Sequence, residues 1–122
     1  MPDRAPGAPK LSGAAKVRIR PGTRAHQLYQ REEIDERYFC NYEMNPKYQA
    51  QFEASGLHIT GVGPQGEPRI FELPAHRYFF ATLFQPMLSS EPGKPHPVIV
   101  SFVQAAAAYH AESRGESSAT AR

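Results

Sequence analysis

Disulfide chemistry and membrane-spanning segments are the features that this sequence most clearly lacks. It has one cysteine, Cys40, which excludes an internal disulfide framework and a structural zinc site built on thiolates. No apolar run approaches the length of about 18 residues that a membrane-spanning helix needs, and no apolar leader opens the chain. We therefore expect a cytoplasmic protein with no membrane as a partner. The net charge of +2 is too small to indicate nucleic acid as a partner.

Proline and glycine are abundant instead, with 12 and 9 copies among 122 residues. That content argues against a helical bundle or a coiled coil and favours a turn-rich mixed fold. The length fits a single domain. Residues 1–15 and 113–122 are rich in small and polar residues and lack recurring large apolar ones, so we expect disordered tails there and one domain at 16–112.

Five segments between the tails have the alternation or apolar character of strands. We expect them at 16–20, 34–44, 57–62, 69–73 and 78–83. The third and fourth flank the turn residues Pro64-Gln65-Gly66 and predict a β-hairpin. The last is almost continuously apolar, which is typical of a strand buried on both faces of a sheet.

Two main helices and one short helical turn complete the pattern. The turn is expected at 25–29, and the first main helix at 46–55, capped by Asn45 and ended by Gly56. The stretch 98–109 opens with β-branched residues that could form a strand, but its alanine block favours a closing helix. His96, between two prolines, is interpreted as the cap of that helix.

The order of these signals resembles the C-terminal half of the class I glutamine amidotransferase domain of CTP synthase. The family pattern there is similar to ERHRHRYEVN, then ELP-H-FF, QFHPE and a PHPLF-type helix start. The corresponding segments in this chain read ERYFCNYEMN (36–45), ELPAHRYFF (72–80), LFQPM (83–87) and PHPVI (95–99). The likeness covers about residues 10–108, and it is closer still to stand-alone proteins described as related to the CTP synthase C-terminal region.

This resemblance implies an α/β fold. It would be a partial class I amidotransferase, a flavodoxin-like sandwich with a mixed sheet, a β-hairpin and two main helices. Family members hydrolyse glutamine with a Cys–His–Glu triad, and CTP synthase uses the ammonia with ATP to aminate UTP to CTP in pyrimidine biosynthesis. The resemblance places four residues at the substrate: Arg37, Asn41, Tyr42 and Glu43. Glu36 and Arg37 are also expected to pair with each other or with neighbours.

Several parts of the glutaminase are replaced or missing. The histidine and glutamate of QFHPE correspond to Gln85 and Met87, which can neither accept a proton near neutral pH nor orient a base. The arginine that grips the substrate carboxylate corresponds to Asn41, and no Gly-x-Cys-x-Gly motif occurs in the 122 residues. The catalytic set is therefore expected to be empty, with no metal and no cofactor.

Three functions follow as hypotheses. The first is a non-catalytic module that binds a small polar ligand or a protein partner, or that self-associates through an uncovered sheet. The second is the C-terminal portion of a longer or split CTP synthase-like amidotransferase. The third is a thiol-dependent enzyme using Cys40, although a buried structural thiol is the commoner role of a lone cysteine and strand alternation points Asn41 away from Cys40.

Overall fold

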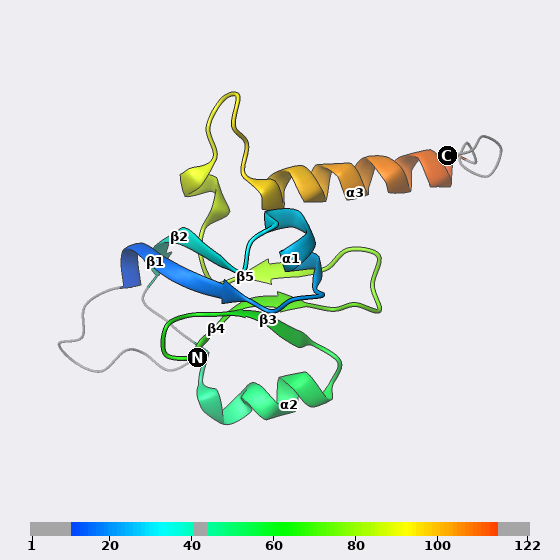
Figure 1. The fold of residues 1–122 in the computed structure, drawn as a ribbon. Helices are drawn as coiled ribbons and strands as arrows, with labels where there is room; N and C mark the ends of the chain where they lie inside the picture. The colour runs from blue at the N-terminus through cyan, green and yellow to red at the C-terminus, as the bar shows by residue number, and fades with distance from the viewer. Residues whose placement is uncertain (1–10, 41–43, 115–122) are drawn as a thin grey trace.

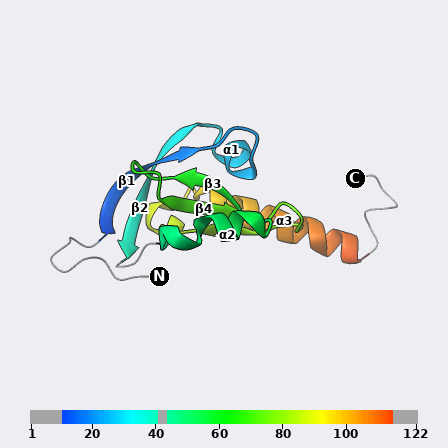
Figure 2. The same ribbon diagram turned by 90° about the horizontal axis from the view of Figure 1, so that it is seen from below.

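A curled five-stranded sheet forms the centre of the fold in the computed structural model, which describes residues 11–40 and 44–114. The helices α1 and α3 lie on one side of the sheet and α2 on the other (Figure 1). Seen from below, α2 lies across the sheet in front of α3 (Figure 2). The elements are, in chain order, β1 (Leu11–Ile19), α1 (Arg24–Tyr29), β2 (Glu33–Cys40), the 3₁₀ turn η1 (Pro46–Tyr48), α2 (Gln49–Ala54), β3 (His58–Val62), β4 (Pro68–Glu72), β5 (Phe80–Thr82), the 3₁₀ turn η2 (Pro86–Ser89) and α3 (Pro97–Ser113).

The strand order is β2-β1-β3-β4-β5, and every pairing among the described residues is antiparallel. The α/β class predicted from the sequence is confirmed, but the resemblance implied a mixed sheet. The difference has a simple cause, because parallel neighbours need crossover connections of a dozen or more residues. Here β3 and β4 are joined by residues 63–67 and β4 and β5 by residues 73–79, and both connections are too short for a parallel crossover.

The predicted hairpin is confirmed as β3–β4, with a register shift around Gly61. A Cβ at Gly61 would lie 2.7 Å from the Ile70 side chain, so the close approach of the two strands requires glycine there. The predicted first helix is also confirmed, as η1 followed by α2. The Asn45 side chain accepts a hydrogen bond from Lys47 N at 3.0 Å, and Gly56 ends the helix with φ of +96°.

Three expected boundaries shift. β1 begins at Leu11, so the expected domain start at residue 16 falls inside the strand, where eight residue pairs join β1 to β2. The second strand ends at Cys40 in the described part of the chain rather than at residue 44. The closing helix α3 runs to Ser113, one residue past the expected domain end.

The prediction that residues 78–83 form a strand buried on both faces is wrong. Only Phe80–Thr82 are in a strand, and all three side chains are partly exposed, because β5 is at the edge of the sheet and pairs with β4 alone. The strand buried throughout is β4, whose five residues are all buried.

Two apolar clusters hold the sheet between its helical layers. The first lies under α1 and consists of Val17, Ile19, Ala25, Ile34, Tyr38, Ile70 and Phe84. The second lies on the α2 side and is built from Met44, Ile59 and Phe71, with partly buried neighbours around them. Successive β4 residues, Ile70 and Phe71, belong to different clusters because side chains alternate between the faces of a strand.

Candidate functional site

A buried cluster of polar side chains joins α1, β2 and the start of α3. Glu36 on β2 is 2% exposed and His96 is 5% exposed. The Nε2 atom of His96 lies 2.5 Å from Glu36 Oε2, and the Tyr29 hydroxyl lies 2.5 Å from the same oxygen. The rings of Tyr29 and His96 meet edge to face with centroids 5.7 Å apart. A carboxylate this deeply buried occurs in proteins where it is paired, and Glu36 is paired with both His96 and Tyr29.

The hydrogen bonds assign a structural task to His96. Val98 N donates to Nδ1 at 3.0 Å, so Nδ1 carries no proton and Nε2–H donates to Glu36. The predicted role of His96 as the cap of the closing helix is therefore confirmed. Because both ring nitrogens are engaged, the imidazole has no free position from which to relay a proton to a substrate.

Tyr29 completes the cluster as a neutral donor. Its burial, together with the hydrogen bond to Glu36, holds the pKa of the Tyr29 hydroxyl well above its ordinary value. The second carboxylate oxygen, Glu36 Oε1, is buried and has no hydrogen-bond partner among the described residues. All three side chains belong to different elements, so the cluster fixes α1 and α3 against β2.

A second buried carboxylate positions the start of α1. Glu72, in the ELP stretch, accepts from Arg24 N at 3.0 Å and, through its other oxygen, from Ala25 N and the Thr60 hydroxyl, both at 2.8 Å. A carboxylate at the N-terminus of a helix satisfies otherwise unpaired amides and complements the helix dipole. Sequence reasoning missed this role, although Glu72 follows the apolar Ile70 in the buried phase of β4.

Glu36 and Arg37 were expected to pair with each other or with neighbours, and Glu36 takes the second course by pairing with His96 and Tyr29. Glu36 faces the first cluster, while Arg37 is exposed, since consecutive residues of a strand point to opposite faces. Three of the predicted substrate-binding residues, Asn41, Tyr42 and Glu43, lie outside the described residues, as does the side chain of Cys40.

The two positions that replace the family's histidine and glutamate are described. Gln85 N donates to Arg37 O at 3.0 Å, and Gln85 Oε1 accepts from Phe39 N at 2.6 Å. The Gln85 side chain is thus bonded to the backbone of β2. The Met87 side chain, in η2, is 62% exposed. In the described part of the chain no group of three or more His, Cys, Asp or Glu side chains could hold a metal ion, and no helix there has the length and hydropathy to cross a membrane.

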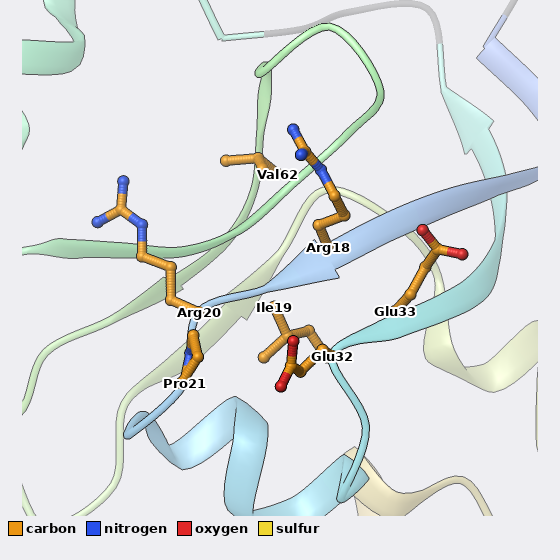
Figure 3. Close-up of a pocket in the computed structure, with 7 residues that line it drawn as sticks. All are labelled: Arg18, Ile19, Arg20, Pro21, Glu32, Glu33 and Val62. Atoms are coloured by element: carbon orange, nitrogen blue, oxygen red, sulfur yellow. The ribbon is translucent and has the colours of Figure 1, made fainter.

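Three hollows on the described surface lie away from these positions. One of about 480 Å³ is found where β1 ends and β2 begins, with Arg18 and Arg20 at the end of β1 and Glu32 and Glu33 at the start of β2 (Figure 3). A groove of about 350 Å³ separates α1 from α3, and a hollow of about 230 Å³ lined only by apolar surface lies beside α2. None of the three is lined by Arg37, Gln85 or Met87.

Comparison with known proteins gives one consistent relationship. No protein-family model matches the chain. It is 44% identical over 101 residues to CTP synthase of Archaeoglobus fulgidus, covering 82% of this chain and 19% of that protein. It is 44% identical over 106 residues to CTP synthase of Thermococcus kodakarensis, covering 85% of this chain and 20% of that protein. The chain therefore spans about a fifth of the length of these curated relatives.

A solved structure agrees with the sequence relatives. The CTPS glutaminase domain of Trypanosoma brucei, with bound acivicin, superposes with a TM-score of 0.79 at 31% identity. The match covers 85% of this chain and 42% of that one. The fold described above is thus the fold of part of a glutaminase domain.

Proposed function

We propose that the chain is an amidotransferase-like module that does not itself hydrolyse glutamine or another substrate. The proposal follows from its similarity in sequence and fold to the C-terminal part of the CTP synthase glutaminase domain. The role of the module is to hold a small polar ligand or a protein partner. The observation that carries the proposal is the hydrogen bond from Phe39 N of β2 to the side-chain amide oxygen of Gln85. Gln85 stands at the position where the family has its catalytic histidine.

The chemistry of the two replaced positions supports this proposal. A primary amide has no basic nitrogen near neutral pH, so Gln85 cannot take the proton from a nucleophile. The exposed Met87 thioether carries no charge with which to orient a base. Loss of a general base lowers enzymatic rates by about 10³- to 10⁶-fold. The only buried histidine described, His96, is committed to Glu36 and α3.

The test is an ammonia-release assay with glutamine and the purified 122-residue chain. We expect release equal to that of a heat-denatured control. The Gln85→His, Met87→Glu double variant serves as a second sample, because it restores the two side chains that the family has at these positions. Release by the wild-type chain above the control would overturn the proposal.

A second candidate function is a portion of a longer or split CTP synthase-like amidotransferase, which would serve glutamine-dependent amination of UTP to CTP. The share of the solved glutaminase domain that this chain matches, 42%, favours it. The coding frame upstream of Met1 distinguishes the two. A strand, a Gly-x-Cys-x-Gly motif and a helix encoded there would favour this candidate over the free-standing module.

A thiol-dependent enzyme using Cys40 is the third candidate. Titration with a thiol reagent at neutral pH tests it, because a catalytic thiol has a lowered pKa and reacts fast. A slow, ordinary reaction would remove this candidate. Ammonia release that Cys40→Ala abolishes would establish it.

A further inference from the structure

The sides of α1 and α3 that face each other carry mostly polar side chains. Figure 1 shows α1 beside the first part of α3, on the same side of the sheet, and a groove of about 350 Å³ separates the two helices. The residues that line it recur at intervals of three and four positions, so they form one stripe on each helix. They are Arg24, Gln27 and Leu28 on α1 and Pro97, Val100, Ser101 and Gln104 on α3.

This lining differs from that of a simple contact between two helices. Helices that only pack together bring apolar stripes into contact. Here four of the seven lining side chains are polar. The side chains of Gln27, Ser101 and Gln104 make no hydrogen bond within the described part of the chain. A concave surface with a few converging polar groups beside apolar ones is typical of a small-molecule site.

The two walls of the groove are fixed in place. At one wall, Glu72 accepts hydrogen bonds from the first amides of α1, and at the other, His96 caps the start of α3. Tyr29, directly after the groove residues of α1, and His96, directly before those of α3, meet at the Glu36 carboxylate. Because this buried cluster ties the helices together, the groove exists before a ligand binds, which lowers the entropic cost of binding.

Arg24 supplies the one charge in the lining. Its Nη2 donates to Arg77 O at 3.0 Å, and its guanidinium lies over the Tyr78 ring, 4.9 Å from the ring centre. These contacts hold the guanidinium in place, while its Nε and Nη1 have no partner among the described residues. A guanidinium with free N–H groups binds a carboxylate through charge-assisted hydrogen bonds.

We propose that the groove between α1 and α3 binds a small monocarboxylate that also carries a neutral hydrogen-bonding group such as an amide. Arg24 pairs with the carboxylate. The amides of Gln27 and Gln104 bind the neutral group, because each can both donate and accept, and the Ser101 hydroxyl adds a third contact. The inference rests on the proposed function, a module that holds a small polar ligand, and it names a site and a ligand class for that module.

The charges of the lining select this class against others. The lining contains no carboxylate, so a cationic group would be desolvated without an opposite charge. A free amino acid such as glutamine carries an ammonium and therefore fits less well than a monocarboxylate without one. A dianion would leave one of its charges unpaired beside the single guanidinium.

A nuclear magnetic resonance titration of the ¹⁵N-labelled 122-residue chain tests the proposal, with N-acetylglycine at pH 7 as the probe. We expect saturable shifts of the side-chain amides of Gln27 and Gln104 and of the backbone amide of Ser101. The dissociation constant should be on the order of 1 mM, as suits a few polar contacts. N-Acetylglycinamide, which lacks the charge, and glutamine, which adds an ammonium, should each bind at least tenfold more weakly.

Two variants and a control locate the site. Arg24→Gln should weaken binding of N-acetylglycine at least tenfold. Arg18→Gln makes the same change of charge at an exposed position of β1 outside the groove and should leave the affinity unchanged. Gln104→Ala should weaken binding at least threefold. It keeps the fold even if the loss of the Arg24 contacts disturbs α1, because Gln104 is exposed and alanine favours a helix.

Shifts that do not saturate, or an affinity that neither Arg24→Gln nor Gln104→Ala lowers, would overturn the site. Equal binding of the neutral amide or of glutamine would overturn the ligand class. The groove is not lined by Gln85 or Met87, so its failure to bind would leave the outcome of the ammonia-release assay unaffected. Conversely, ammonia release by the wild-type chain would overturn the proposed function and leave binding in the groove measurable.

Discussion

At the scale of single residues, the buried charges explain more of the sequence motifs than catalysis does. Glu36 and His96 belong to the segments ERYFCNYEMN and PHPVI, which are 60 positions apart. In the fold they form one buried pair with Tyr29, and the pair determines where α3 begins. A motif that identifies a relationship can thus mark a structural contact instead of a reacting group.

Removing the histidine of this pair should destabilise the fold strongly. His96→Ala leaves the Glu36 carboxylate buried without its partner and removes the cap of α3, so we expect a loss of about 3–5 kcal/mol in the free energy of unfolding. His96→Asn should recover about 1 kcal/mol of that loss, since asparagine is a good cap. Urea unfolding at pH 7 measures both. The exposed His110→Ala is the control, and a His96→Ala variant as stable as that control would contradict the prediction.

Tyr38 should make the protein less stable in alkaline solution. Burial raises the pKa of its hydroxyl to about 12, while the nearby Arg69 guanidinium opposes the rise. The unfolded state has the ordinary pKa of 10.0. Below pH 10 the Tyr38 hydroxyl keeps its proton in both the folded and the unfolded state, so the contribution of Tyr38 to the stability is fully present there. Between pH 10 and 12 only the unfolded state releases it, so the stability falls as the pH rises.

The comparison with Tyr38→Phe isolates this effect. Phenylalanine keeps the ring over which the Arg69 guanidinium lies, 4.9 Å from its centre. Wild type should lose up to about 3 kcal/mol more than the variant between pH 10 and 12, as two pKa units imply. The other tyrosines, including Tyr29, are the same in both proteins, so their effects cancel in the difference. Parallel stability curves over this range would refute the assignment.

At the scale of elements, local signals located most of the structure. The Asn45 cap, Gly56 and the turn at 64–66 act through nearby backbone, so α2 and the β3–β4 hairpin could be predicted from the sequence. Burial could not, because it depends on which strands become neighbours. The apolar segment 78–83 contributes only the edge strand β5, whereas β4 is buried although it contains an arginine and a glutamate. Glu72 binds the α1 amides, and the Arg69 guanidinium lies over the Tyr38 ring.

The candidate site was predictable only in part. The cap formed by His96 follows from its place before Pro97, whereas its bond to Glu36 joins residues 60 positions apart and leaves no local sequence signal. The pocket expected around Asn41 falls outside the described residues. Gln85 could be identified as a replaced position from the sequence, but its bond to Phe39 N depends on how the chain after β5 meets β2.

The hydrogen bonds that Glu72 accepts from the start of α1 should be detectable in amide hydrogen-exchange rates. Glu72→Gln replaces one acceptor oxygen with a donor, so at least one of the bonds from Arg24 N, Ala25 N and Thr60 is lost, at about 1–3 kcal/mol. We expect faster amide hydrogen exchange at the start of α1. Thr23→Ala, which removes the cap accepting from His26 N, is the matched variant and should cost about 1 kcal/mol. Unchanged exchange at Arg24 and Ala25 in Glu72→Gln would count against this role.

At the scale of the whole molecule, the interior between the strands is filled, while apolar surface on α3 and beside α2 is exposed. The two clusters and the buried carboxylates complete the interior between β2 and β4. The outer face of α3 and the apolar hollow beside α2 remain open to solvent. The described residues thus combine a buried apolar interior with uncovered apolar surface on α3 and beside α2.

The two clusters should nevertheless unfold together, because β4 joins them. Ile70 is fully buried in the first cluster and its neighbour Phe71 is buried in the second, so neither cluster can open without displacing the same strand. Ile70→Val should cost about 0.5–1.5 kcal/mol. The methyl resonances of Ile34 in the first cluster and Ile59 in the second should report one shared urea midpoint, shifted equally by the substitution. If Ile70→Val moves the Ile34 transition and leaves that of Ile59 in place, the clusters are independent units and β4 does not couple them.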